Sequence, residues 1–123
     1  MSKKPEPKDL NSEMVGSQGR SAEKSIYNSA DATYWVRAKE DLGKVRIEGD
    51  TSAPVGKYDF VALYPEQPGS DPNQGYLTYF YVESSTSLKT DETWGSGYWV
   101  AYGAWDYALD KYVKVVEAGP TEG

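Results

Sequence analysis

The chain of 123 residues contains no cysteine and no histidine. Without cysteine it forms no disulfide and supplies no thiolate as a nucleophile or metal ligand. Without histidine, Ser-His-Asp and Cys-His catalytic arrangements are excluded, and so is a zinc or iron site with histidine ligands. The most common general base of enzymes is therefore also missing. These absences favour a non-catalytic domain without a cofactor.

Hydrophobic runs long enough to cross a membrane are missing as well. The first residues, Met1–Lys8, are basic, but no apolar segment of the kind found in signal peptides follows them. The lack of cysteine suits a reducing compartment. The sequence therefore predicts a soluble, cytoplasmic protein that does not insert into a membrane, and it leaves export by another route open.

Positive charge is scarce, with 13 Lys and Arg against 19 Asp and Glu, a formal net charge of -6 and a sequence pI ≈ 4.6. The phosphates of nucleic acids and of anionic lipid headgroups would repel such a chain. A net negative charge of this kind keeps a protein soluble. We therefore expect neither a nucleic acid nor an anionic membrane surface as a partner.

Residues 1–30 are polar, rich in Gly, Pro, Ser, Lys and Glu, and without hydrophobic periodicity. Such a segment buries too little apolar surface to offset the entropy that ordering would cost. The sequence thus predicts a disordered tail over residues 1–30, a folded domain over residues 31–119 and a flexible C-terminus over residues 120–123.

From Thr33 onward, short apolar stretches alternate with turn residues. Residues 33–39 and 44–48 alternate between apolar and polar positions, which predicts that Val45 and Ile47 face the core. Residues 58–64 are apolar on both faces and are expected as a central strand, and residues 76–82 are expected as another continuous strand. The expected strands are 33–39, 44–48, 58–64, 76–82, a short edge strand within 84–90, 97–105 with a kink at Gly103, and 111–116.

Strands at this short spacing, with no helical pattern, predict an all-β fold. Aromatic residues reach 14% of the chain, mostly 11 Tyr and 4 Trp, and such side chains pack well in strands. The 12 Gly and 7 Pro suit a protein with many turns. We predict an antiparallel immunoglobulin-like β-sandwich of about seven strands.

The stretch Asp59-Phe60-Val61-Ala62-Leu63-Tyr64 resembles the D-W-I/V-G-L/I-F/Y strand of SKICH domains and of the N-terminal domains of purple acid phosphatases. In both families a Pro/Gly-rich loop follows, then an aromatic strand like residues 76–82 and a further strand like residues 98–102. Phe60 and Ala62 stand where the families have Trp and Gly. The resemblance, over residues 59–102, implies an immunoglobulin-like sandwich and, by analogy with SKICH domains, an interaction role. It carries over no functional residue.

Exposed indole and phenol rings anchor partner proteins or stack on sugar rings. Trp99 and Trp105 are six residues apart and share one face of their strand. Both become an exposed strip if the opposite face, with Tyr98, Val100 and Tyr102, is buried, and both are core residues otherwise. The candidate ligand-binding residues are Trp94 in a polar loop, Trp99, Trp105, Tyr107 and Tyr76.

Carboxylates at loops and strand ends are candidate ligands for calcium, but their spacing matches no known calcium loop. Asp106 and Asp110 flank a turn whose amides they can satisfy. A carboxylate pair acting on a glycoside needs no histidine, yet a domain of this size leaves little room for a cleft. We therefore predict no metal site and no catalytic residue. The six carboxylates considered are Asp59, Asp71, Asp91, Glu92, Asp106 and Asp110.

Three hypotheses for function follow from these features. The first is a binding module that recognises a protein partner through loops and aromatic surface residues. The second is a carbohydrate-binding domain that uses Trp94, Trp99 and Trp105. The third is a small secreted toxin, inhibitor or immunity-type protein.

Overall fold

The computed structural model describes residues 25–28 and 32–123, and within these ranges every regular element is a β-strand. The β-branched and aromatic residues that dominate the apolar stretches favour this conformation. The strands are β1 (Ser25–Asn28), β2 (Thr33–Asp41), β3 (Lys44–Thr51), β4 (Phe60–Tyr64), β5 (Thr78–Tyr81), β6 (Ser87–Thr93), β7 (Trp99–Asp106) and β8 (Lys111–Ala118).

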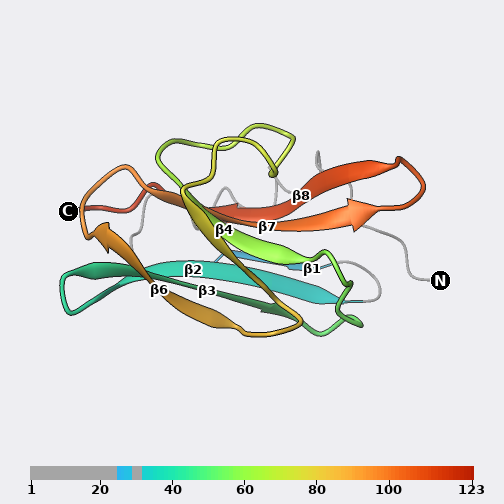
Figure 1. Ribbon diagram of the computed structural model, residues 1–123, viewed down its shortest axis with the longest axis horizontal. Helices are drawn as coiled ribbons and strands as arrows, with labels where there is room; N and C mark the ends of the chain where they lie inside the picture. The colour runs from blue at the N-terminus through green and yellow to red at the C-terminus, as the bar shows by residue number, and fades with distance from the viewer. Residues whose placement is uncertain (1–24, 29–31) are drawn as a thin grey trace.

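The strands form two antiparallel sheets of four strands each, drawn as two layers in Figure 1. The first sheet has the order β1-β2-β3-β6, and the second has the order β5-β4-β7-β8. β3 and β4 are consecutive in the chain but lie in different sheets, as do β5 and β6. Such crossovers are typical of immunoglobulin-like sandwiches. The predicted all-β sandwich is confirmed.

The main core lies between the two sheets and is built from alternate residues of each strand. Val36, Ala38, Val45 and Ile47 of the first sheet are fully or almost fully buried there. The second sheet contributes Val61, Leu63, Val100, Tyr102 and Val113. The predicted inward orientation of Val45 and Ile47 is therefore confirmed.

The core also contains one buried polar pair. The Tyr102 hydroxyl donates a hydrogen bond of 2.7 Å to Oδ2 of Asp59, and the Tyr102 ring packs edge-to-face on Tyr34. Burial raises the pKa of the Tyr102 phenol well above its usual range, and the nearby Asp59 carboxylate raises it further. The Asp59 carboxylate thus accepts a hydrogen bond inside the sandwich rather than at its surface.

The pairing of β7 with β8 shifts register between Tyr102 and Gly103, and the extra residue belongs to β8. Tyr102 lies opposite Val116 and Gly103 lies opposite Lys114, so Val115 has no counterpart. A bulge of this kind reverses which side chains face inward. Val115 and Val116 consequently both join the main core, and Lys114 and Glu117 both point to the outer face. The kink expected at Gly103 is thus a bulge of the neighbouring strand.

Three sequence predictions differ from the structure. Residues 25–28, which the prediction places in the tail, form β1, paired with residues 33–36 of β2. The remainder of the predicted tail, residues 1–24, 29 and 30, lies outside the described residues. The continuous strand predicted over residues 76–82 is the four-residue β5 at the edge of its sheet, with Tyr79 and Tyr81 half-exposed. The expected edge strand within residues 84–90 is the longer β6.

Ion pairs cover the outer face of the first sheet. Nη2 of Arg37 lies 2.6 Å from Oε1 of Glu48, and Nζ of Lys39 lies 3.2 Å from Oε2. Nε of Arg46 lies 2.6 Å from Oδ2 of Asp41. The hydrogen bond from Arg46 keeps the pKa of Asp41 below its ordinary value. Burial raises the pKa of Glu48, but hydrogen bonds from Arg37 and Lys39 outweigh this effect and lower it.

Candidate functional site

The outer face of the second sheet holds a smaller core of its own. Phe60, Ala62 and Tyr64 of β4 are buried there with Ala101 of β7, and Trp99 and Tyr112 pack against them. Gly103 allows Phe60 and Pro72 to pack this closely, because a Cβ atom built on it would lie 2.5 Å from Phe60 and 3.0 Å from Pro72. The aromatic rings of β4 therefore pack directly on the backbone of β7.

The loop over residues 65–77 covers part of this face, and it is the green-to-yellow segment above β4 in Figure 1. The Tyr64 hydroxyl donates a hydrogen bond to the Pro72 carbonyl oxygen. Nζ of Lys114 donates to the Pro68 carbonyl oxygen over 3.1 Å, and the Gln67 amide donates to Glu117 over 2.6 Å. The buried pair of Lys114 and Glu117, 2.6 Å apart, thus anchors the loop.

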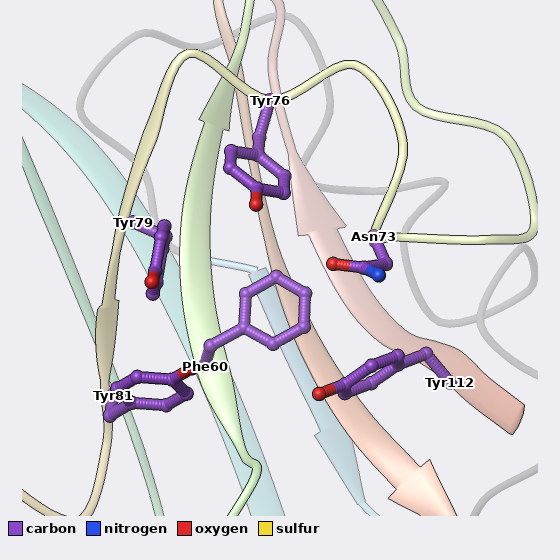
Figure 2. A pocket seen from close by; sticks show the side chains of 6 residues that line it. All are labelled: Phe60, Asn73, Tyr76, Tyr79, Tyr81 and Tyr112. Carbon is purple, nitrogen blue, oxygen red and sulfur yellow. The ribbon is translucent and has the colours of Figure 1, made fainter.

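Beyond the loop, four tyrosines surround the ring of Phe60. We call Tyr76, Tyr79, Tyr81 and Tyr112 the tyrosine cluster. Figure 2 shows their rings around Phe60, with the Asn73 side chain directed toward the same space. Tyr79 and Tyr81 are alternate residues of β5 and so share its outer face, whereas Tyr112 comes from β8 and Tyr76 from the end of the loop. The cluster thus brings together side chains from the two edge strands of the sheet, β5 and β8.

The rings pack edge-to-face rather than side by side. The ring centroids of Tyr76 and Tyr79 are 5.3 Å apart, and those of Tyr79 and Tyr81 are 5.2 Å apart. Phe60 contacts Tyr76, Tyr79 and Tyr112 with centroid distances of 6.3, 6.1 and 5.4 Å. Edge-to-face packing satisfies the quadrupoles of the rings and holds each side chain in place. The cluster is therefore an ordered surface.

The hollow between the rings is small, with a volume of about 40 Å³. Pockets that enclose drug-sized ligands usually have volumes of several hundred Å³. Tyr76, Tyr79 and Tyr81 are nevertheless each about two fifths exposed. The rings around the hollow are therefore open to solvent, and the hollow itself has room only for a small group.

Two phenols of the cluster, those of Tyr81 and Tyr112, have a raised pKa in the folded protein. A hydrogen bond with Tyr79 raises the pKa of the Tyr81 phenol above its ordinary value. Burial raises the pKa of the Tyr112 phenol. Protonated phenols both donate and accept hydrogen bonds. The surface thus offers aromatic area together with hydroxyl groups.

The five residues predicted from the sequence lie at separate places. Tyr76 belongs to the cluster, and the Trp105 ring packs edge-to-face on Tyr112, with centroids 5.0 Å apart. Trp99 and Trp105 do share the outer face of β7, but Trp99 is half-buried against the smaller core. Trp94 is half-buried against the main core, and Tyr107 is exposed at the tip of the β7–β8 hairpin.

The sequence reasoning missed Tyr79, Tyr81, Tyr112 and Phe60. The Tyr79-Phe80-Tyr81 alternation carried a signal, because two residues with polar hydroxyls flank a purely apolar one. Phe80 is buried in the main core, as this alternation requires. Tyr112 joins the others only through the pairing of β7 with β8, which a single sequence does not reveal.

The candidate calcium ligands serve other purposes or lie apart. Oδ1 of Asp106 accepts hydrogen bonds from the amides of Ala108 and Leu109, and Oδ1 of Asp71 accepts one from Asn73. Across residues 25–28 and 32–123, no group of three or more acidic side chains is placed to hold a metal ion. The same ranges contain no helix long and apolar enough to span a membrane.

No protein-family model, curated protein or solved structure matches this chain. The resemblance of residues 59–102 to SKICH domains and to phosphatase N-terminal domains therefore stays a prediction.

Proposed function

We propose that this domain is a non-catalytic binding module that recognises a protein partner through the tyrosine cluster. The observation that carries the proposal is the ordered set of four tyrosines around Phe60. Tyrosine is enriched where binding energy concentrates in protein interfaces, because its ring has a large contact area and its hydroxyl still forms a hydrogen bond. The low pocket volume fits a flat protein surface better than a small molecule.

The position of the cluster on β5 also supports a protein partner. β5 is the last strand of its sheet, and Thr78–Tyr81 contains neither proline nor a charged residue. Natural proteins usually protect such edges with charge, proline or covering loops. An extended segment of a partner can hydrogen-bond to this edge while its side chains contact Tyr79 and Tyr81. We therefore expect the partner to present an extended segment.

Quantitative capture from an extract of the native host tests this proposal. The full chain is compared with a variant in which Tyr76, Tyr79 and Tyr81 are replaced by serine, and with K39A on the ion-paired face of the first sheet. We expect a partner that K39A retains and the triple variant loses, with both variants folded by circular dichroism. Equal capture by all three proteins would refute a role for the cluster.

A carbohydrate ligand is the second candidate, and Asn73 is the observation that favours it. Its amide lies beside the rings of the hollow, and an amide next to an aromatic ring suits a sugar hydroxyl and the apolar face of a sugar ring. The mutually perpendicular tyrosine rings, however, form no flat platform for a polysaccharide. A glycan array followed by tyrosine-fluorescence titration of N73A separates this candidate from the first. The toxin, inhibitor or immunity-type hypothesis stays a prediction.

A further inference from the structure

We propose that the tyrosine cluster is a site of oxidative cross-linking, at which Tyr79 forms a dityrosine bond with Tyr76 or Tyr81. Tyr79 is the shared neighbour, with ring centroids 5.3 Å from Tyr76 and 5.2 Å from Tyr81. In an edge-to-face pair at this separation, carbon atoms of one ring touch the other ring. The two rings of each pair are therefore already in contact.

Exposure makes the cluster accessible to an oxidant. The residues Tyr76, Tyr79 and Tyr81 are 37%, 39% and 42% exposed. Tyr107 is more exposed, at 69%, but it takes part in none of the ring pairs found among residues 25–28 and 32–123. Tyr107 therefore separates the effect of exposure from the effect of a neighbouring ring.

The reaction needs a one-electron oxidant, for which we name a peroxidase with hydrogen peroxide. Each of two phenols loses one electron and its hydroxyl proton and becomes a phenoxyl radical. The two radicals form a carbon–carbon bond between positions next to the oxygens, and each ring then moves one ring hydrogen to its oxygen. The tyrosine pair loses two hydrogen atoms in total, and one hydrogen peroxide is reduced to two waters.

Proximity favours coupling within one molecule. A radical on Tyr79 has a second phenol in contact, so coupling does not wait for an encounter between two chains. The edge-to-face contact between Tyr79 and Tyr81 keeps these two rings together. We therefore expect a cross-linked monomer rather than a dimer at low protein concentration.

The full chain is treated with peroxidase and hydrogen peroxide at micromolar concentration, and the products are digested with trypsin. Tyr76, Tyr79 and Tyr81 all lie in the single tryptic peptide 58–89, whereas Tyr107 lies in the peptide 90–111. We expect dityrosine fluorescence in the monomer and a peptide 58–89 that has lost two hydrogens and does not fragment between the joined residues.

Y79F retains the ring but removes the phenol, and Y107F is the matched control. We expect Y79F to lose the modified peptide 58–89 and Y107F to keep it, while both melt like the unsubstituted chain. A yield in Y79F equal to that of the unsubstituted chain would overturn the proposal. So would a product consisting mainly of dimers or of peptides joined through Tyr107. None of these results depends on a binding partner, so the cross-linking and binding proposals fail separately.

Discussion

The outer face of the first sheet is charged, whereas the outer face of the second sheet is aromatic. On the first sheet, Arg37 and Lys39 both form ion pairs with Glu48 at the surface, and Arg46 forms one with Asp41. On the second sheet, a loop covers part of an aromatic layer and leaves the tyrosine cluster open. Self-paired charges already have partners, but half-exposed rings gain from being covered. The comparison points to the second face for recognition.

The two faces also differ in how deeply their ion pairs are buried. This difference gives the largest expected effect on the free energy of unfolding. Lys114 and Glu117 are buried beneath the loop, whereas Lys39 is half-exposed. K114M leaves the Glu117 carboxylate buried without its cation, and we expect a loss of about 3–5 kcal/mol in the free energy of unfolding. K39M is expected to cost no more than about 1 kcal/mol.

Urea denaturation of both variants measures this difference. Replacing the pair together, as K114M with E117L, is expected to recover most of the stability, because apolar residues often replace a buried ion pair without loss. Equal losses in K114M and K39M would show that the buried pair does not hold the loop.

A backbone contact on the aromatic face gives the next largest effect. In G103A the new Cβ atom would meet the Phe60 ring at 2.5 Å, so Phe60 or β7 must move. We expect a loss of about 1–3 kcal/mol, as for other overpacked cores. G69A is the control within the covering loop, since no atom lies within 4 Å of its Cβ position, and we expect a change within about 0.5 kcal/mol.

Thermal unfolding compares these two glycine variants, and the aromatic region of the NMR spectrum reports on the tyrosine rings. We expect the tyrosine resonances to shift in G103A and to stay in place in G69A. An unaltered spectrum in G103A would show that Phe60 does not support the cluster.

The smallest expected effect is on the pH dependence of stability, to which the two faces contribute at opposite ends of the pH range. The pKa values of Asp41 and Glu48 are lowered in the folded protein, so the unfolded state binds more protons in acid. The stability from these pairs is complete above about pH 5 and is lost as the pH falls through the lower folded values. Burial raises the pKa of Tyr64, so the folded state binds more protons in alkali. That contribution is complete below about pH 10 and is lost at higher pH.

Stability measured across pH in two variants checks these signs. E48Q is expected to flatten only the acid side, and Y64F only the alkaline side. A variant that flattened the opposite side would contradict the assignment of these groups.

Features set by a pattern within one strand could be predicted from the sequence, whereas features set by pairing between strands could not. Alternation within one strand placed Val45 and Ile47 correctly, because burial of one face is a local pattern. The Val115-Val116 doublet marks the β8 bulge, but only the pairing with β7 shows that Lys114 and Glu117 share a face. Residues 76–82 contain seven residues suited to a strand, yet β5 covers only Thr78–Tyr81. The amides of Leu77 and Val82, on either side of β5, still donate to the carbonyl oxygens of Leu63 and Asp59.

The candidate site was harder to predict for the same reason. Tyr76 is a candidate from the sequence because it lies near the other aromatic candidates in the chain. Tyr79 stands out only once rings from β4, β5 and β8 meet at Phe60. The tryptophans are candidates because they are large aromatic residues. Two of the three, Trp94 and Trp99, instead pack against the cores. Strand order decides which aromatic residues support the fold and which remain at the surface.

Amide hydrogen exchange of the domain, alone and bound to the captured partner, tests the central claim most directly. We predict slower exchange on binding at residues 76–81 and around Tyr112, with unchanged exchange over residues 37–48 of the charged face. Protection confined to residues 37–48, with none at the tyrosine cluster, would contradict the claim that the aromatic face is the one that binds.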